Sequence, residues 1–113
     1  MSDAVIKRGE YSRYAADEGV FVKYFFRGKD DNVPITTFEI IIMPGFTLSP
    51  HTHDDAIGYF HVISGECELW HDGAWKPLRK GEASYAPVNV EHGLRNVGQE
   101  ILVIFAIMGP PGV

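Results

Sequence analysis

The sequence contains a single cysteine, Cys67, among its 113 residues. One thiol excludes an internal disulfide and suits a protein that is kept in a reducing compartment. No apolar run approaches the roughly 20 residues that a membrane-spanning helix needs. The first residues also lack the apolar core of a secretory signal. These absences predict a cytoplasmic protein that does not use a membrane as a partner.

Positive charge is sparse and scattered. Ten Lys and Arg stand against fifteen Asp and Glu, which gives a formal net charge of −5. Nucleic-acid-binding proteins normally concentrate positive charge on one face, because neutralising phosphates supplies most of their affinity. An anionic membrane surface attracts the same kind of cluster. The charge pattern therefore disfavours both a nucleic acid and a membrane surface as partners.

Long helical patterns are absent too, and the one candidate helix is a turn around residues 15–18. Short runs rich in Val, Ile, Phe, Tyr and Thr alternate with Gly, Pro, Asn and Asp, which is typical of strands. Their spacing of about 8–12 residues predicts a sandwich or barrel. A chain of this length predicts a single domain, 1–113, because two domains would each have too small a core. The expected strands are Val20–Phe26, Ile35–Met43, Leu48–His53, Ile57–Ile63, Glu66–His71, Ala74–Leu78, Glu82–Ala86, His92–Asn96 and Ile101–Ile107.

One hairpin is predicted in detail. Asp72 and Gly73 suit the two central positions of a type I′ turn, where both residues need a positive φ. That turn places Trp70 opposite Trp75 on the neighbouring strand. Packing in a core or an interface is the expected role of this pair, in preference to stacking on a ligand.

Three of the five histidines fall in a pattern that suits a metal ion. His51 and His53 are two residues apart in a stretch expected to be extended, so both side chains point to the same face. His92 is the candidate for a third ligand from another strand facing them. Neutral imidazole suits Zn, Fe, Ni and Cu. A His-x-His pair alone is a weak signal, since such pairs are common on surfaces.

Glycines and a proline frame these histidines at fixed spacing. The first block, residues 45–65, holds Gly45, the His-x-His pair and Gly65; the second, residues 81–96, holds Gly81, Pro87, His92 and Asn96. Both blocks resemble the two conserved motifs of the cupin family. The resemblance implies an all-β fold, a double-stranded β-helix or jelly-roll barrel, with one divalent metal inside. Residues 1–18 would then form an N-terminal arm.

Two positions depart from the family pattern. Asn89 replaces a glycine of the second motif, and asparagine tolerates the left-handed region that such a turn needs. Gly58 stands where the family usually has a glutamate ligand, so three imidazoles would leave coordination positions open. Two residues are candidates for a substitute fourth ligand. Asp55 shares the parity of His53, whereas His61 would need a bulge to face inward.

The resemblance implies a metal-dependent enzyme that acts on a small anionic or enol-type molecule. Cupins that lack the glutamate include thiol, gentisate-type and diketone-cleaving dioxygenases with three-His iron sites. An Fe2+-dependent dioxygenase is therefore the first interpretation. A non-oxidative isomerase, lyase or cyclase that uses Zn2+, Ni2+ or Mn2+ as a Lewis acid is the second. A metal-loaded binding module without turnover is the third.

Residue type and strand parity predict roles for other residues near the expected site. Tyr59, Tyr85 and His61 are the catalytic candidates, because each could donate or accept a proton. Arg95 should face away from His92, and Cys67, between two glutamates, should be a poor nucleophile. Asn96 is expected to be structural. The candidate lining residues are Phe38, Ile40, Ile42, Phe60, Val62, Tyr85, Leu94, Phe105 and Ile107.

The apolar run Val20–Phe26 is expected to form an edge strand. Exposed edges of this kind invite pairing with another chain. A two-fold homodimer is therefore predicted.

Overall fold

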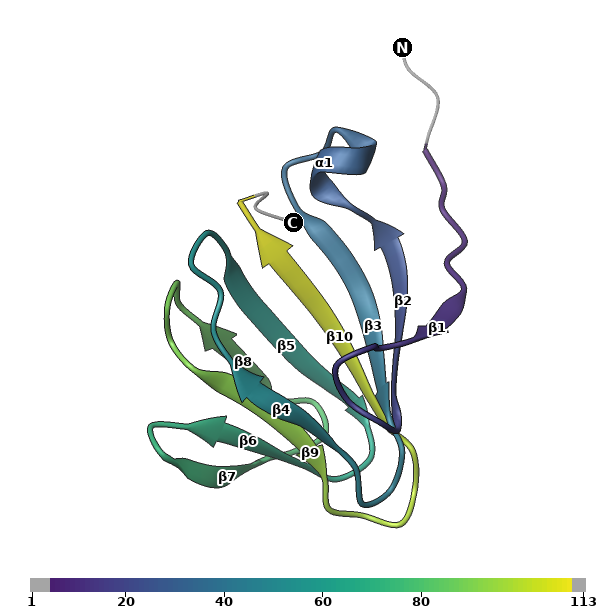
Figure 1. The fold of residues 1–113 in the computed structure, drawn as a ribbon. Helices are drawn as coiled ribbons and strands as arrows, with labels where there is room; N and C mark the ends of the chain where they lie inside the picture. The colour runs from purple at the N-terminus through teal and green to yellow at the C-terminus, as the bar shows by residue number, and fades with distance from the viewer. Residues whose placement is uncertain (1–4, 111–113) are drawn as a thin grey trace.

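A computed structural model describes residues 5–110 as two antiparallel β-sheets (Figure 1). The larger sheet has the strand order β1-β2-β3-β10-β5-β8, and the smaller has β4-β9-β6-β7. None of the helices in this part of the chain is long and apolar enough to cross a membrane. The elements are β1 (Tyr11–Arg13), β2 (Val20–Phe26), α1 (Gly28–Asp31), β3 (Thr36–Ile42), β4 (Thr47–His51), β5 (Ile57–Ser64), β6 (Cys67–His71), β7 (Ala74–Leu78), β8 (Ala83–Ala86), β9 (His92–Asn96) and β10 (Leu102–Gly109).

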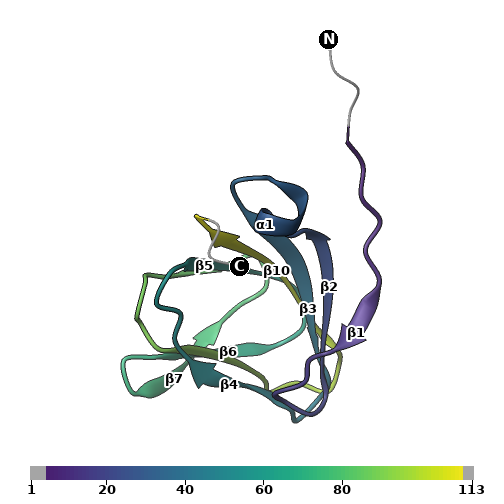
Figure 2. The ribbon, with the colours of Figure 1, turned by 45° about the horizontal axis from the view of Figure 1, so that its top comes forward.

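The two sheets form opposite walls of a barrel (Figure 2). Consecutive strands often lie in different sheets: β3 is in the larger sheet, β4 in the smaller, and β5 in the larger again. This alternation is the double-stranded β-helix that the sequence predicted. The short helix α1 lies at one end of the barrel, between β2 and β3 (Figure 1).

All nine expected strands are present, and their ends differ from the predicted ones by at most two residues. The prediction of a helical turn at residues 15–18 is wrong, because these residues do not form a helix. Those residues form turns that connect β1 to β2, where the Tyr14 amide donates to the Val20 carbonyl at 2.9 Å. The short helix is α1 instead, which ends at Asn32 in the left-handed conformation (φ 54°).

Side chains alternate between the barrel interior and the outer surface. In β3, Phe38, Ile40 and Ile42 are buried, and the residues between them are partly exposed. The interior is apolar, with Asn96 as one of its few polar members. The Asn96 amide donates to the carbonyls of Ile42 and Glu100 at 2.9 and 2.7 Å, and its side-chain oxygen accepts from the Gly98 amide. Asn96 thus ties β9 to two other chain segments, which confirms its structural role.

Six of the nine predicted lining residues face inward and are buried: Phe38, Ile40, Ile42, Phe60, Val62 and Leu94. The other three predictions are wrong. Phe105 and Ile107 are only partly buried, because the alternation in β10 turns Ile104, Ala106 and Met108 inward instead. Tyr85 is 58% exposed and pairs with Tyr59 on the outer surface.

The strand β2 is not an edge strand. The short strand β1 pairs with it, with Ser12 opposite Val22, and β3 pairs with its other side. The expected N-terminal arm, 1–18, therefore contributes a strand to the sheet, and the edge-strand prediction is wrong. Residues 1–4 of that arm lie outside the described residues. The homodimer stays a prediction.

Both turn predictions are confirmed. Asp72 and Gly73 have φ values of 52° and 79°, as a type I′ turn requires. The Trp70 and Trp75 rings on either side are 5.4 Å apart, edge to face. Asn89 has a φ of 62°, so it adopts the left-handed conformation expected at the position of the motif glycine.

Candidate metal centre

Three imidazoles meet at one point of the smaller sheet. One ring nitrogen from each of His51, His53 and His92 lies within 4.8 Å of the other two. The ring centroids are 4.5 Å apart for His51 and His92, 4.9 Å for His51 and His53, and 5.4 Å for His53 and His92. The sequence prediction that these histidines converge is correct.

The local geometry differs from the expected one in two respects. The strand β4 ends at His51, so His53 lies just beyond it and not within a continuous strand. His92 comes from the adjacent strand of the same sheet, directly opposite His51, and not from a facing sheet. The pairing of β4 with β9 contains a register shift between Leu48 and His51, which is an irregularity of the β-bulge kind.

A glycine next to His92 makes this close pairing possible. A Cβ added to Gly93 would lie 2.9 Å from the Pro50 backbone nitrogen and 3.0 Å from the Leu48 carbonyl oxygen. Both neighbours are backbone atoms, which cannot move without shifting β4. Gly93 therefore lets β4 approach β9 just before His51, and the motif analysis did not identify this residue.

Backbone carbonyls fix the orientation of two rings. The Nδ1 of His51 lies 2.7 Å from the Ser49 carbonyl oxygen, and the Nδ1 of His92 lies 3.0 Å from the Val90 carbonyl oxygen. Because a carbonyl only accepts hydrogen bonds, both Nδ1 atoms must carry the proton. The Nε2 atoms then hold free lone pairs, which is the arrangement that metal-binding histidines commonly use.

His92 provides a direct test of whether these residues fit a metal. Its side chain is 4% exposed, and its Nε2 is buried with no hydrogen-bond partner among the described residues. A buried acceptor without a partner costs free energy. A divalent transition metal beside the other two imidazoles would satisfy it, since all three donors are neutral nitrogens that such ions bind well. The residues therefore fit a three-His metal site.

Burial favours the neutral, metal-binding form of two of the rings, those of His92 and His53. Burial lowers the pKa of His92 below its ordinary value, the bond to Val90 raises it by less, and repulsion from His51 and then His53 lowers it again by smaller amounts. Burial also lowers the pKa of His53, followed by the effect of His51, while Asp54 and Asp55 raise it by less. Both rings therefore lose a competing proton more easily than a free histidine does.

No carboxylate joins the three imidazoles among the described residues. Asp55 is exposed and outside the cluster, and His61 is on the outer surface of β5, opposite Ala83 and Phe105. His61 alternates with the buried Phe60 and Val62, and no bulge in β5 reverses it. Neither predicted candidate for a fourth ligand is therefore near enough to coordinate with the histidines.

A cavity of about 330 Å³ opens beside the histidines. Its apolar surface comes from both sheets. The lining residues are Tyr14, Val20, Val22, Tyr24, Arg27, Thr36, Phe38, Ile40, Leu48, His51, His53, Phe60 and Met108. A volume of this size falls at the lower end of the range for small-molecule sites.

The polar residues of this cavity were not predicted from the sequence. Tyr24 follows Val20 and Val22 at the same parity, so strict alternation along β2 could have placed it inside. Tyr14 and Arg27 lie outside the regular part of β2, and no motif contains them. Burial raises the pKa of Tyr14, with smaller contributions from Asp17 and Tyr24.

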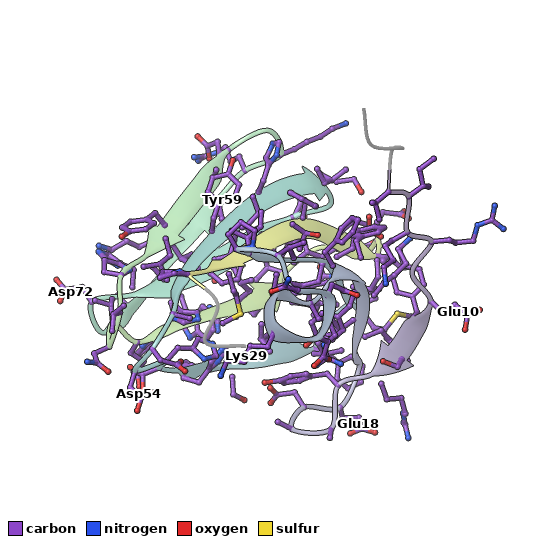
Figure 3. The ribbon with its side chains drawn as sticks, turned by 90° about the horizontal axis from the view of Figure 1, so that it is seen from above. Glu10, Glu18, Lys29, Asp54, Tyr59 and Asp72 are labelled. Atoms are coloured by element: carbon purple, nitrogen blue, oxygen red, sulfur yellow. The ribbon has the colours of Figure 1, made fainter. Side chains whose placement is uncertain are left out.

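The three catalytic candidates named from sequence do not line this cavity. Tyr59, His61 and Tyr85 share the outer surface of the larger sheet. In Figure 3, which views the barrel from above, Tyr59 projects outside the sheet and Asp54 lies at the rim. The alternation of β5 and β8 explains the placement, since Gly58, Phe60 and Ala86 take the inward positions.

Two further predictions are confirmed. Arg95 faces away from the histidines: its guanidinium bonds to Glu68 at 2.5 Å and lies 4.4 Å from the Trp75 ring centroid. Burial raises the pKa of the Cys67 thiol to about 12; a backbone hydrogen bond with Arg95 lowers this pKa by less, and repulsion from Glu68 raises it by a smaller amount still. Cys67 is therefore a poor nucleophile, chiefly because it is buried.

The fold and the site together define a small jelly-roll barrel with a candidate metal centre formed by three histidines. The chain belongs to the cupin family: the family model described as "Cupin domain" matches residues 38–108, which include both histidine blocks.

One curated protein and two solved structures are similar to this chain. The chain is 35% identical over 60 residues to the polyketide synthase CurC of Streptomyces cyaneus, covering 53% of this chain and 39% of that protein. A predicted oxalate decarboxylase from Thermotoga maritima has a TM-score of 0.81 at 17% identity, covering 95% of this chain and 99% of that one. The cupin domain of an XRE family transcriptional regulator from Enterobacter cloacae has a TM-score of 0.72 at 27% identity, covering 83% and 99%. The chain spans between 39% and 51% of the length of three curated relatives that it matches.

Proposed function

We propose that this chain is a metal-dependent cupin enzyme acting on a small anionic or enol-type molecule, with Fe2+-dependent dioxygenase chemistry as the first candidate. One observation supports this above the others. His92 presents a buried Nε2 without a partner among the described residues, beside two more imidazoles and a cavity large enough for a small organic molecule.

A divalent metal bound here would supply Lewis-acid chemistry and, if it is iron, redox chemistry as well. The chain's own residues have separate tasks. The carbonyls of Ser49 and Val90 hold two of the rings by their Nδ1 protons. Phe60 and Leu48 exclude water from the cavity beside the rings, which strengthens electrostatic interactions there. Three neutral ligands leave the full charge of a divalent ion uncompensated, which favours an anionic or enolised substrate.

The relatives add support for an enol-type substrate. CurC is named as a polyketide synthase, and polyketides are built of alternating carbonyl and methylene carbons, which enolise readily. We therefore propose that the substrate carries a 1,3-dicarbonyl group, and that this group faces the metal. Gly58, in place of a glutamate ligand, supports open coordination positions for such a group.

Oxygen uptake distinguishes the candidate chemistries. The Fe2+-loaded protein should consume oxygen when a simple 1,3-diketone such as acetylacetone is added, and the His92→Ala variant should not. His71→Ala, at the exposed tip of the hairpin, is the matched control and should behave as wild type. The protein loaded with Zn2+, Ni2+ or Mn2+ could instead turn over the diketone under anaerobic conditions, while the iron form takes up no oxygen. That result would contradict the dioxygenase proposal and support the non-oxidative alternative.

A non-catalytic binding module is the second candidate. The likeness to the cupin domain of an XRE family transcriptional regulator supports it, because that domain is part of a regulator. This candidate predicts that a metal and a 1,3-diketone bind without conversion of the diketone. Recovery of unchanged diketone after long incubation with each of the four metals would favour it over both enzymatic proposals.

We also propose a cytoplasmic location and a homodimer. The single cysteine is free and buried, which suits a reducing compartment. Light scattering should give twice the chain mass of 12.6 kDa at micromolar concentration. A stable species of 12.6 kDa would remove the dimer from the proposal.

A further inference from the structure

Within residues 5–110, Arg27 is the one permanently charged side chain that lines the cavity. It follows directly after β2, in the larger sheet, whereas His51 ends β4 in the smaller sheet that faces it and His53 lies just beyond that strand. The cavity therefore has a candidate metal site on one wall and a cation on the opposite wall. No Asp or Glu is among the described residues that line this cavity.

Aromatic contacts hold Arg27 in place. Its guanidinium carbon lies 4.0 Å from the centroid of the Tyr24 ring, within the range of a cation–π contact. The Tyr24 ring in turn packs at 5.3 Å against Phe38, which is 7% exposed. A guanidinium stacked in this way loses little further freedom when it binds an oxyanion with its N–H groups.

The existing partners of Arg27 leave its hydrogen-bonding capacity largely unused. Its ion pair in the described residues joins Nε to Asp30 at 4.0 Å, the outer limit for such a pair. The two side chains are 53% and 76% exposed, and an ion pair of that kind contributes little. A guanidinium has five N–H donors, so a bidentate acceptor would find most of them available.

We infer that the substrate is an organic molecule with an oxyanion at one end and the metal-binding enol at the other. The oxyanion, a carboxylate or a phosphate, binds Arg27 at the end of the cavity near α1. Apolar side chains between the two ends, among them Ile40, Phe60 and Met108, enclose the body of the molecule. Binding of the enol at the metal rests on the proposed function, whereas binding of the oxyanion by Arg27 rests on the cavity alone.

A matched set of small probes tests the role of Arg27 by calorimetry. The probes are 4,6-dioxoheptanoate, its methyl ester, and the phosphonate with the same diketone; the ester differs from the acid in lacking the negative charge and carrying one methyl group. Wild type should bind the acid about tenfold more tightly than the ester, as one charge-assisted hydrogen-bonded pair permits. Arg27→Gln should bind the acid as weakly as the ester and should leave the ester unchanged.

Arg79→Gln is the matched control, because Arg79 is exposed and does not line the cavity. It should bind all three probes as wild type does. Tighter binding of the acid would identify a carboxylate as the natural anion, and tighter binding of the phosphonate would identify a phosphate. Equal affinity of wild type for acid and ester, absence of binding by any probe, or an equal loss for both in Arg27→Gln would overturn the inference.

The same titrations separate this inference from the proposed function. Each is repeated on protein freed of metal by a chelator, in which an Arg27-dependent preference for the acid should persist. If the protein takes up no metal, the proposed function fails, and the acid-to-ester ratio of the metal-free protein still decides the role of Arg27. If metal and ester bind normally but the acid has no advantage, the inference alone fails.

Discussion

The phenyl ring of Phe60 fills the space into which a side chain on Gly58 would project. A Cβ at position 58 would lie 3.0 and 3.1 Å from two atoms of that ring, closer than side chains normally pack. The same ring is 5.3 Å from the His92 ring. Where relatives in this family usually have a glutamate, this protein has an apolar ring beside the histidines.

This relationship predicts that restoring the glutamate destabilises the protein. Gly58→Glu should lower the free energy of unfolding by about 1–3 kcal/mol, because the new side chain is forced against a packed ring. Urea unfolding followed by circular dichroism measures the change. Gly58→Ala, which adds only the Cβ, should cost less.

A double-mutant cycle assigns that cost to Phe60. In a Phe60→Leu background the ring atoms are gone, so Gly58→Glu should be tolerated better than in wild type, with a coupling of about 0.5–3 kcal/mol. Additive effects of the two substitutions would show that the clash lies elsewhere.

The sequence predicted most of the fold because alternation and turn residues are local signals. The turn at Asp72 and Gly73 follows from residue type alone, whereas the left-handed Asn89 was predicted because it takes the place of the motif glycine. The failures came from tertiary context. Nothing in the sequence Tyr11–Arg13 shows that it pairs with β2, and the inward phase of β10 depends on its register with β3.

For the site, the motif spacing predicted the ligands but not their surroundings. His51, His53 and His92 could be identified because two spaced blocks contained them. Arg27 could not be identified, because it follows a strand and strand alternation does not predict which way its side chain points. Gly93 could not either, since its role depends on how closely the backbone at Pro50 approaches it.

Gly93 leads to a prediction about positioning. Gly93→Ala should push β4 away from β9, because the added methyl meets backbone atoms at 2.9 and 3.0 Å. Metal affinity, measured by competition with a chromophoric chelator, should fall by about tenfold, in the range found when support around a metal site is lost.

Gly98→Ala is the control for that experiment. Its added methyl meets the side chain of Glu66, which can move, and not the backbone. Gly98→Ala should keep the metal affinity of wild type. Unchanged affinity in Gly93→Ala would contradict the role assigned to this glycine.

Cys67 gives the protein a pH-dependent stability at alkaline pH. Burial raises its pKa from 9.0 to about 12 in the folded state. The folded state therefore keeps the thiol proton while the unfolded state loses it, so this stabilisation is complete below pH 9 and declines as pH rises from 9 toward 12. The loss should approach about 1.4 kcal/mol per pH unit within that window.

Comparison with Cys67→Ala isolates this effect from other titrating groups. The difference in unfolding free energy between wild type and Cys67→Ala should be constant from pH 7 to about 9. At pH 10 wild type should have lost stability relative to Cys67→Ala, because only its unfolded state releases the thiol proton. Alkylation by iodoacetamide at pH 8 should be fast in guanidinium and slow in the native protein. Equal alkylation rates would mean that the thiol is accessible.

The metal content of the protein tests the central claim that three imidazoles form one binding site. After reconstitution with Fe2+ or Zn2+ and removal of excess ion, inductively coupled plasma mass spectrometry should find one ion per chain in wild type and in the His71→Ala control. His92→Ala should lose affinity by more than about 100-fold, because the loss of an outer hydrogen-bond partner alone costs about 10–100-fold. That variant should retain almost no metal. A wild-type protein that takes up no divalent ion, or a His92→Ala variant that retains as much as wild type, would contradict the account.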